Sequence, residues 1–377
     1  MSITTIESTI IKSSSIDVAV VANGQALTIP VYQIKGHENA PSVYIQANMH
    51  GAEVQGNAVI YQLLEQLKSL NCLGDITIVP LANPMGINQK SGEFTLGRFD
   101  AITGENWNRG YHFNPQLPIE FAKNNPDLDE ASIKQQFKQC LLDDLDASRL
   151  NNAYGAKTSQ LLCAQLQRMS FKADIVLDLH TGPISSRHLY CPDYAKNKAA
   201  LFDIPHVLFI PNEFDGAMDE ASFCPWWDLQ QAYQAQGRDI DVLVDAFTLE
   251  LGSQEWLSLE TAKEDCHSIL SYLQASKVIE SDHFQPTVMT RYGCDLSDYR
   301  AMYAPQSGLV EYLAAFGKPL KAGEPLAQLL RMDRYGEDDC ITLVNAPDDC
   351  IPVLHFASAS VNQGTELYKM MTNYFTL

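Results

Sequence analysis

The sequence predicts an α/β protein with a largely parallel sheet flanked by helices, followed by a small all-β domain. Between residues 43 and 249, short apolar segments typical of buried strands alternate with patterns typical of amphipathic helices. This alternation favours parallel strands joined by helices. From about residue 290 the chain changes to short strands and turns rich in Gly and Pro, without a long helix. We therefore predict one domain over residues 1–285 and a second over 290–377.

The composition is that of an ordinary globular protein with a strong acidic excess. The 377 residues include 26 Lys and Arg against 46 Asp and Glu, which gives a net charge of −20. Such a surface repels phosphate groups, so neither nucleic acid nor an anionic membrane is a predicted partner. No apolar run approaches the ~18 residues of a membrane span, and residues 1–15 lack a signal-peptide pattern. The nine cysteines include no C-x-x-C pair, which indicates reduced thiols and a cytoplasmic location.

Several elements of the first domain can be placed by residue range. Strands are predicted at 15–20 and 27–32, because Asn23-Gly24 between them is a hairpin turn signal. Apolar residues at helical spacing predict a helix over 53–69 and two more over 131–170. The remaining strands are predicted at 43–47, 76–81, 174–179, 207–210 and 244–249.

The second domain carries a faint internal repeat. The segment 304–310 is echoed by 346–352, and the starts of these segments lie 346 − 304 = 42 residues apart. Residues 320–326 are echoed in the same way by 361–367. The repeat predicts an all-β domain built from two similar halves.

Three predicted strands of the first domain end in residues that can bind a metal. His50 and Glu53 follow the strand at 43–47, His180 ends the strand at 174–179, and Glu250 ends the last one. The carboxyl ends of parallel strands face one crevice, where α/β proteins bind ligands. Two histidines and one carboxylate form a ligand set that suits the zinc of a hydrolase, since a fourth position then stays open for water. Each of these residues taken alone is more simply explained as a hydrogen-bonded loop or strand-end residue.

The order of these motifs resembles the succinylglutamate desuccinylase/aspartoacylase family, relatives of the zinc carboxypeptidases. The chain has H-G-A-E at 50–53, N-P at 83–84, N-R at 108–109, D-L-H-T-G at 178–182 and T-L-E-L-G at 248–252. The resemblance covers roughly residues 43–252. It implies a zinc carboxypeptidase-like fold and one Zn²⁺ per chain.

The resemblance also implies the roles of individual residues. His50, Glu53 and His180 would bind the zinc ion, and Glu250 would be the catalytic carboxylate. Arg98 would lie near the scissile carbonyl. The list is completed by two substrate-binding residues, Asn108 and Arg109, which would hold the carboxylate of the amino-acid part.

The substrate-binding pair lies in a segment whose composition predicts a long loop. Residues 82–115 are rich in Gly, Asn and Pro, and long loops inside compact domains usually carry function. The planar guanidinium of Arg109 suits a carboxylate in a bidentate way, although a surface ion pair would also explain an exposed arginine. The chain departs from the family two residues before the Asn-Arg pair, where Asn106 replaces the usual acidic residue.

The second domain resembles a biotinyl/lipoyl-type barrel-sandwich. The likeness rests on residues 305–310 and 317–327. A carrier domain needs a lysine on the hairpin between its halves, and no lysine lies between Lys321 and Lys369. We therefore interpret residues 290–377 as a structural or lid-like module.

These inferences predict a cytoplasmic, zinc-dependent amidohydrolase that cleaves an N-acyl amino acid or a similar small anionic carboxylate. A metallocarboxypeptidase that trims peptides is the alternative enzyme, because the same residues would serve it. A non-catalytic binding protein on the same scaffold is a further alternative.

Overall fold

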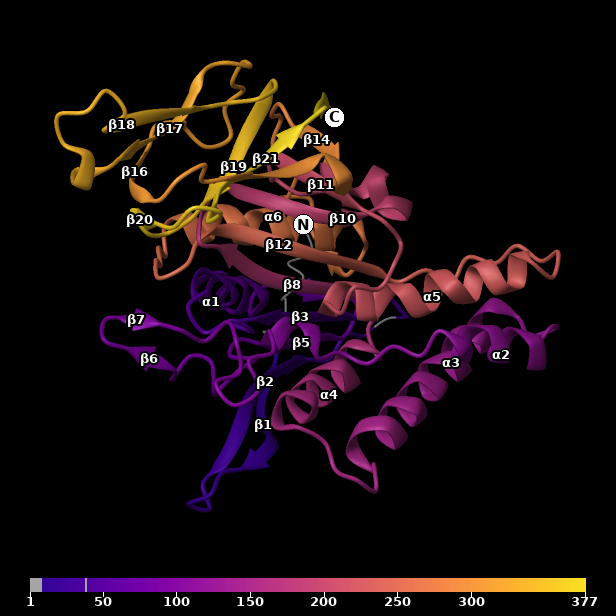
Figure 1. The fold of residues 1–377 in the computed structure, drawn as a ribbon. Helices are drawn as coiled ribbons and strands as arrows, with labels where there is room; N and C mark the ends of the chain where they lie inside the picture. Colours follow the sequence, from indigo (N-terminus) through magenta and orange to yellow (C-terminus); the bar gives the residue numbers. More distant parts are fainter. Residues whose placement is uncertain (1–8, 38) are drawn as a thin grey trace. The chain divides into compact units, whose positions relative to one another are not determined.

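The computed structural model describes residues 9–37 and 39–377 (Figure 1). The predicted absence of a signal peptide rests on residues 1–15, and residues 1–8 of that segment lie outside the described residues. The chain divides into two compact units. The first comprises Met1–His180, Asn212–Thr248 and Glu255–Pro286, and the second comprises Thr181–Pro211, Leu249–Gln254 and Thr287–Leu377. Each unit is described by itself.

The first unit is built on a mixed sheet whose strands follow the order β1-β2-β5-β3-β8-β12. The hairpin β1–β2 is antiparallel, whereas β3 runs parallel to both β5 and β8. Every residue of β3 is buried, as its apolar run predicted. The strands span β1 Ile11–Val20, β2 Ala26–Ile34, β3 Val43–Ala47, β5 Ile76–Val79, β8 Ile175–Gly182 and β12 Asp245–Ser253, with the short strands β4 Asn71–Cys72 and β13 Ile279–Glu280 paired separately.

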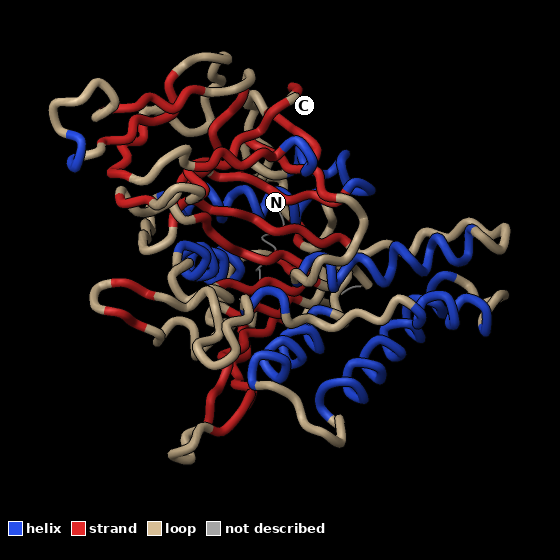
Figure 2. The backbone as a smooth tube through the Cα atoms, viewed as in Figure 1, coloured by secondary structure: helices blue, strands red, loops and turns tan. Residues whose placement is uncertain are grey.

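Helices of the first unit, blue in Figure 2, include those predicted at 53–69 and 131–170. The helix α3 begins where Asp129 accepts a hydrogen bond from the backbone of Ser132, 2.9 Å away, which is a standard N-cap. The helices span α1 Gln55–Leu67, α2 Gln116–Asn124, α3 Glu130–Leu145, α4 Thr158–Ser170, α5 Met218–Gln234 and α6 Thr261–Ala275. Within the described part of the chain, none of the helices is long and apolar enough to cross a membrane.

The helix α5 forms despite Pro225 in its interior. A proline there removes one backbone hydrogen bond and normally interrupts a helix. The helix nevertheless buries Trp226, Leu229 and Tyr233 in an apolar cluster with Phe137 of α3. Packing of these large side chains therefore outweighs the local cost of the proline.

The second unit combines parallel and antiparallel sheets. Strands β10, β11 and β14 run parallel to one another, and β22 adds to β14 as an antiparallel strand. Two further sheets have four strands each, in the orders β15-β21-β19-β9 and β18-β17-β16-β20. These separate antiparallel sheets support the predicted all-β character of the C-terminal segment. The strands span β9 Ile184–Ser185, β10 Arg187–Pro192, β11 His206–Ile210, β14 Tyr292–Asp295, β15 Tyr299–Tyr303, β16 Gly308–Tyr312, β17 Pro325–Leu330, β18 Ile341–Asn345, β19 Cys350–His355, β20 Ser360–Val361, β21 Glu366–Thr372 and β22 Phe375–Thr376.

The two halves of the predicted repeat exchange backbone hydrogen bonds reciprocally. Gly323 of the first half donates to the carbonyl of Ala346 in the second at 2.8 Å, and Gly364 of the second donates to Ala304 of the first at 2.9 Å. Both glycines have positive φ, +87° and +82°, where an L side chain is strained. Both alanines are buried in one apolar cluster. The sequence repeat thus corresponds to a repeated structural joint.

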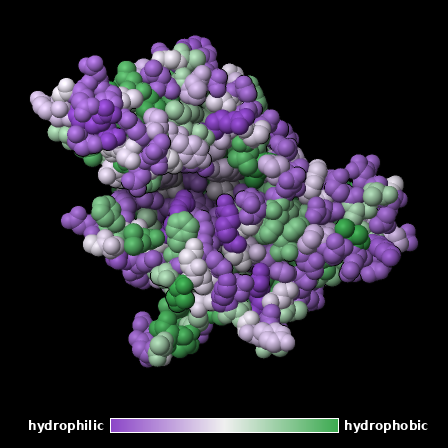
Figure 3. Space-filling view, in the orientation of Figure 1, coloured by the Kyte–Doolittle hydropathy of each residue, from purple (hydrophilic) through white to green (hydrophobic). Residues whose placement is uncertain are grey.

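The face of the molecule shown in Figure 3 is mostly hydrophilic, and its apolar residues lie in separate patches. One of these patches lies on the β1–β2 hairpin at the bottom of the view, where Val20 and Val21 are exposed. A hydrophilic face is expected of a chain whose net charge is −20.

We predict that Gly364→Ala lowers the free energy of unfolding by about 1 kcal/mol, because only the backbone conformation opposes the added methyl group. A Cβ at this position would meet no atom of the described chain within 4 Å. The measurement is urea denaturation, with Gln363→Ala at the neighbouring exposed position as the control. Equal stability of the two variants would refute a strained joint at Gly364.

Candidate metal centre

The metal-binding candidates lie where β3 and β8 end side by side. The parallel register pairs Ala47 with Leu179, so the residues that follow these strands emerge at the same edge. After β3, Asn48 adopts a left-handed conformation with φ of 65°. Its side-chain amide donates to the carbonyls of His50 and Gly51 at 3.1 and 3.2 Å, which folds the segment into a tight turn before α1.

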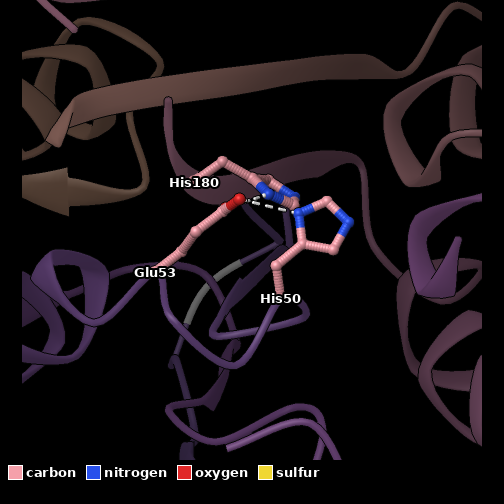
Figure 4. Close-up of side chains that lie close together, drawn as sticks. All are labelled: His50, Glu53 and His180. Atoms are coloured by element: carbon pink, nitrogen blue, oxygen red, sulfur yellow. Dashed lines mark hydrogen bonds and ion pairs between the residues drawn. The ribbon is translucent and has the colours of Figure 1, made fainter. Parts of the chain in front are cut away.

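The structure brings His50, Glu53 and His180 together (Figure 4). Nδ1 of His50 lies 2.8 Å from Oε1 of Glu53, and Nδ1 of His180 lies 2.8 Å from Oε2 of the same carboxylate. All three side chains are buried, and their ligand atoms lie within 4.8 Å of one another. A single ion could therefore contact all three.

The opposite nitrogen of each ring is held by a hydrogen-bond acceptor. Nε2 of His180 lies 2.9 Å from Oδ2 of Asp178, and Nε2 of His50 lies 2.8 Å from Oδ1 of Asn106. Both acceptors require the ring proton on Nε2, which leaves the Nδ1 lone pair for a metal. Asp178 is itself held by Gln46, whose amide donates to Oδ1 at 2.9 Å.

The charges in this cluster stabilise one another. Burial alone would raise the pKa of the Glu53 carboxyl, but the imidazoles of His50 and His180 outweigh it and hold the pKa well below its usual range. Burial would lower the pKa of His180, yet the Asp178 and Glu53 carboxylates raise it well above the usual value. Burial lowers the pKa of His50 against the effect of Glu53. The cluster is thus an environment that favours positive charge next to the Glu53 carboxylate.

The chemistry of these donors fits zinc. Two imidazole nitrogens and one carboxylate form the ligand set of a catalytic zinc, which keeps one further position for water. The hydrogen bonds from Nε2 to Asp178 and Asn106 fix the ring orientation, as is usual around metal-binding histidines.

The loop 82–115 packs directly on this turn because three glycines allow close backbone contact. The amide of Gly51 donates to the carbonyl of Gly97 at 2.9 Å. A Cβ at Gly51 or Gly97 would lie 2.1 Å from the carbonyl oxygen of Gly86, so no side chain fits there. This contact places Arg98 beside Glu53, with Nη2 3.7 Å from Oε1.

The predicted substrate-binding residues lie in the short 3-10 helix Trp107–Arg109 of the same loop. Nδ2 of Asn108 lies 3.4 Å from Nε2 of His180, and its Oδ1 is buried without a hydrogen-bond partner among the described residues. Arg109 is half exposed; its Nε lies 3.9 Å from Asp215, and its Nη1 donates to the Asn108 carbonyl at 2.8 Å. Asn108 therefore lies at the histidine cluster, whereas Arg109 forms a weak, exposed ion pair with Asp215.

Glu250 lies on β12, in the part of that strand that belongs to the second unit. Within that unit its charge acts on Tyr299 of β15. Burial raises the pKa of Tyr299 well above its usual value, and the charges of Tyr190 and Glu250 raise it further.

Comparisons with known proteins agree with these motifs. The sequence profile of the succinylglutamate desuccinylase/aspartoacylase catalytic domain matches residues 39–276. The chain belongs to this family. Two crystallised family proteins, from Shewanella frigidimarina NCIMB 400 and Shewanella amazonensis SB2B, are each 53% identical to it. The match to the first covers 98% of this chain and 99% of the other chain, with a TM-score of 0.95. The match to the second covers 97% of this chain and 100% of the other chain, with a TM-score of 0.94.

More distant structures share the fold alone. A family structure from Rhodobacter sphaeroides is 17% identical with a TM-score of 0.68, over 97% of this chain and 96% of its own. A comparison with curated proteins found no match to the chain.

Sequence motifs pointed to the three metal-binding candidates but not to the residues that hold them. Asn106 was noted only as a departure from the family, two residues before the Asn-Arg pair. Gln46 carried no signal beyond being a polar residue in an apolar strand, which is itself unusual because buried polar groups need partners.

Proposed function

We propose that the chain is a zinc-dependent amidohydrolase that removes the acyl group from an N-acyl amino acid or a similar small anionic carboxylate. The observation that carries this proposal is the buried His50, Glu53 and His180 set in a chain of this family. One zinc per chain is the proposed cofactor, and the cytoplasm the proposed compartment.

A zinc ion at these donors would supply a water molecule of lowered pKa and would polarise the scissile carbonyl. Glu250 would accept a proton from the attacking water and then donate it to the leaving amine. Arg98 has its guanidinium at the edge of the cluster, 3.7 Å from Glu53, where it can stabilise the negative charge that develops on the carbonyl oxygen.

Substrate recognition is assigned to the 3-10 helix that carries Asn108 and Arg109. An anionic substrate is repelled by a protein of charge −20 until it meets a local cation. Arg109 supplies that cation, and its only ion pair in the described structure is the exposed contact with Asp215. Asn108 would hold the carboxylate beside Arg109 through its Nδ2, and its buried Oδ1 is then available to accept a hydrogen bond from a substrate N–H.

The same residues would serve a metallocarboxypeptidase. An assay of the zinc-loaded protein against a panel of N-acyl amino acids and a matched panel of dipeptides separates the two reactions. Faster cleavage of the N-acyl amino acids supports the proposal, and faster cleavage of peptides favours the carboxypeptidase. Zinc binding without turnover of either panel favours a binding protein.

We also propose that residues 1–285 form the catalytic domain and that residues 290–377 form a barrel-sandwich-like domain. The reciprocal hydrogen bonds between its repeats support the second part. Lys369 lies within β21, not on a hairpin, so the domain offers no site for a biotinyl or lipoyl group there.

We predict that Glu250→Gln retains zinc but lowers kcat at least ~100-fold, because an amide cannot move the proton. Metal analysis and steady-state kinetics check both parts. Glu260→Gln, at an exposed residue paired with Lys263, is the control and should leave kcat unchanged. Near-normal turnover of Glu250→Gln would remove this residue from the mechanism, and loss of zinc would make it a ligand.

We predict that Arg109→Lys lowers kcat/KM about ten-fold or more, because a point charge replaces a bidentate fork. The loss should disappear for a substrate whose carboxylate is amidated, since no anion then remains to be held. Arg300→Lys, at an exposed arginine of β15, is the control. Equal activity of the wild-type protein on acid and amide would contradict a carboxylate anchor.

A further inference from the structure

We propose that Asn106 is a positioning residue that couples the metal ligand His50 to the turn that presents Asn108 and Arg109. The inference deepens the proposed function and rests on it. It assigns to one amide oxygen both the orientation of a ligand ring and the shape of the substrate-binding turn.

The side-chain oxygen of Asn106 accepts two hydrogen bonds. One comes from Nε2 of His50 at 2.8 Å, and the other from the backbone amide of Asn108 at 2.9 Å. The second bond caps the 3-10 helix Trp107–Arg109, for which Asn106 is the N-cap residue. A single atom therefore contacts both the metal cluster and the substrate-binding turn.

The backbone of Asn106 is fixed independently of its side chain. Asn106 forms an antiparallel bridge with Phe99, and the amide of Trp107 donates to the carbonyl of Arg98 at 3.2 Å. The loop is therefore closed on itself at this point, with Arg98 on one side and Asn108 on the other. A side-chain change at position 106 can remove the two hydrogen bonds without removing these backbone contacts.

The two ligand histidines are held by unlike acceptors. His180 faces the carboxylate of Asp178, whereas His50 faces the neutral amide of Asn106. A carboxylate acceptor makes an imidazole a stronger metal donor than an amide does, because the charge-assisted hydrogen bond increases ring basicity. The amide still fixes the Nε2–H tautomer of His50, so it orients the ring without adding a negative charge.

Loss of the amide oxygen should have two separable effects. His50 would lose the acceptor that selects its tautomer, which weakens metal binding. The amide of Asn108 would lose its cap, so Asn108 and Arg109 would be less well placed to hold a substrate. The first effect is seen in metal affinity without substrate, and the second in KM at saturating zinc.

The test compares Asn106→Leu, which removes the acceptor at similar size, with Asn106→Asp, which keeps it and adds charge. Zinc affinity is measured by competition with a chelator on metal-free protein. We expect Asn106→Leu to weaken zinc binding about 10- to 100-fold and to raise KM, and Asn106→Asp to bind zinc at least as tightly as the wild type. The Nε2–H tautomer of His50, followed by ¹⁵N NMR, should be lost only in Asn106→Leu.

Asn114→Leu is the matched control, because the Oδ1 of Asn114 also accepts a backbone hydrogen bond, from Gln116 at the start of α2, and the other described partner of its side chain is Asp144, not a metal candidate. Should Asn106→Leu lower the Tm more than the control, Asn106→Ala replaces it with a smaller side chain. Zinc affinities of the wild type and the acceptor-free variant within two-fold would overturn the role of Asn106 while leaving the proposed function intact. Failure of the wild type to bind zinc would overturn both.

Discussion

The structure of the site depends on one buried carboxylate shared by two imidazoles. Glu53 is 2% exposed, and each of its oxygens lies 2.8 Å from a histidine Nδ1. An isolated carboxylate at this depth would be strongly unfavourable, so positive charge must gather around it. The positions of His50, His180 and Arg98 satisfy that requirement, and the outer partners Asp178 and Asn106 then fix the rings. A divalent cation would satisfy it more completely than ring protons.

The glycines of the loop make this arrangement possible. Gly51 and Gly97 each meet the backbone at Gly86 so closely that any side chain would collide. The loop can therefore cover the turn that carries His50 and Glu53. It also brings Arg98, Asn106 and Asn108 to the site. The regular structure of this loop is limited to two short strands and the 3-10 helix Trp107–Arg109, so these close backbone contacts help to hold it on the turn.

Much of this arrangement could be predicted from the sequence. Apolar runs placed β3 and β8, and the rule that parallel strands end at one edge predicted that His50, Glu53 and His180 would meet. The ring nitrogen that faces Glu53 could not be predicted, because it depends on Asp178 and on Asn106, which lies 56 residues from His50. The helix α5 was also missed, since Pro225 is a local signal against a helix and only the packing of Trp226 and its neighbours overrides it. The repeat near the C-terminus was visible in sequence, but its reciprocal hydrogen bonds were not.

Anomalous X-ray diffraction from zinc-loaded crystals, recorded on both sides of the zinc absorption edge, tests the central claim most directly. The account predicts one zinc peak per chain, ~2.0–2.1 Å from Nδ1 of His50 and His180 and ~2.0–2.2 Å from a carboxylate oxygen of Glu53. A peak bound elsewhere, coordination through Nε2 of either histidine, or no peak after zinc loading would contradict it.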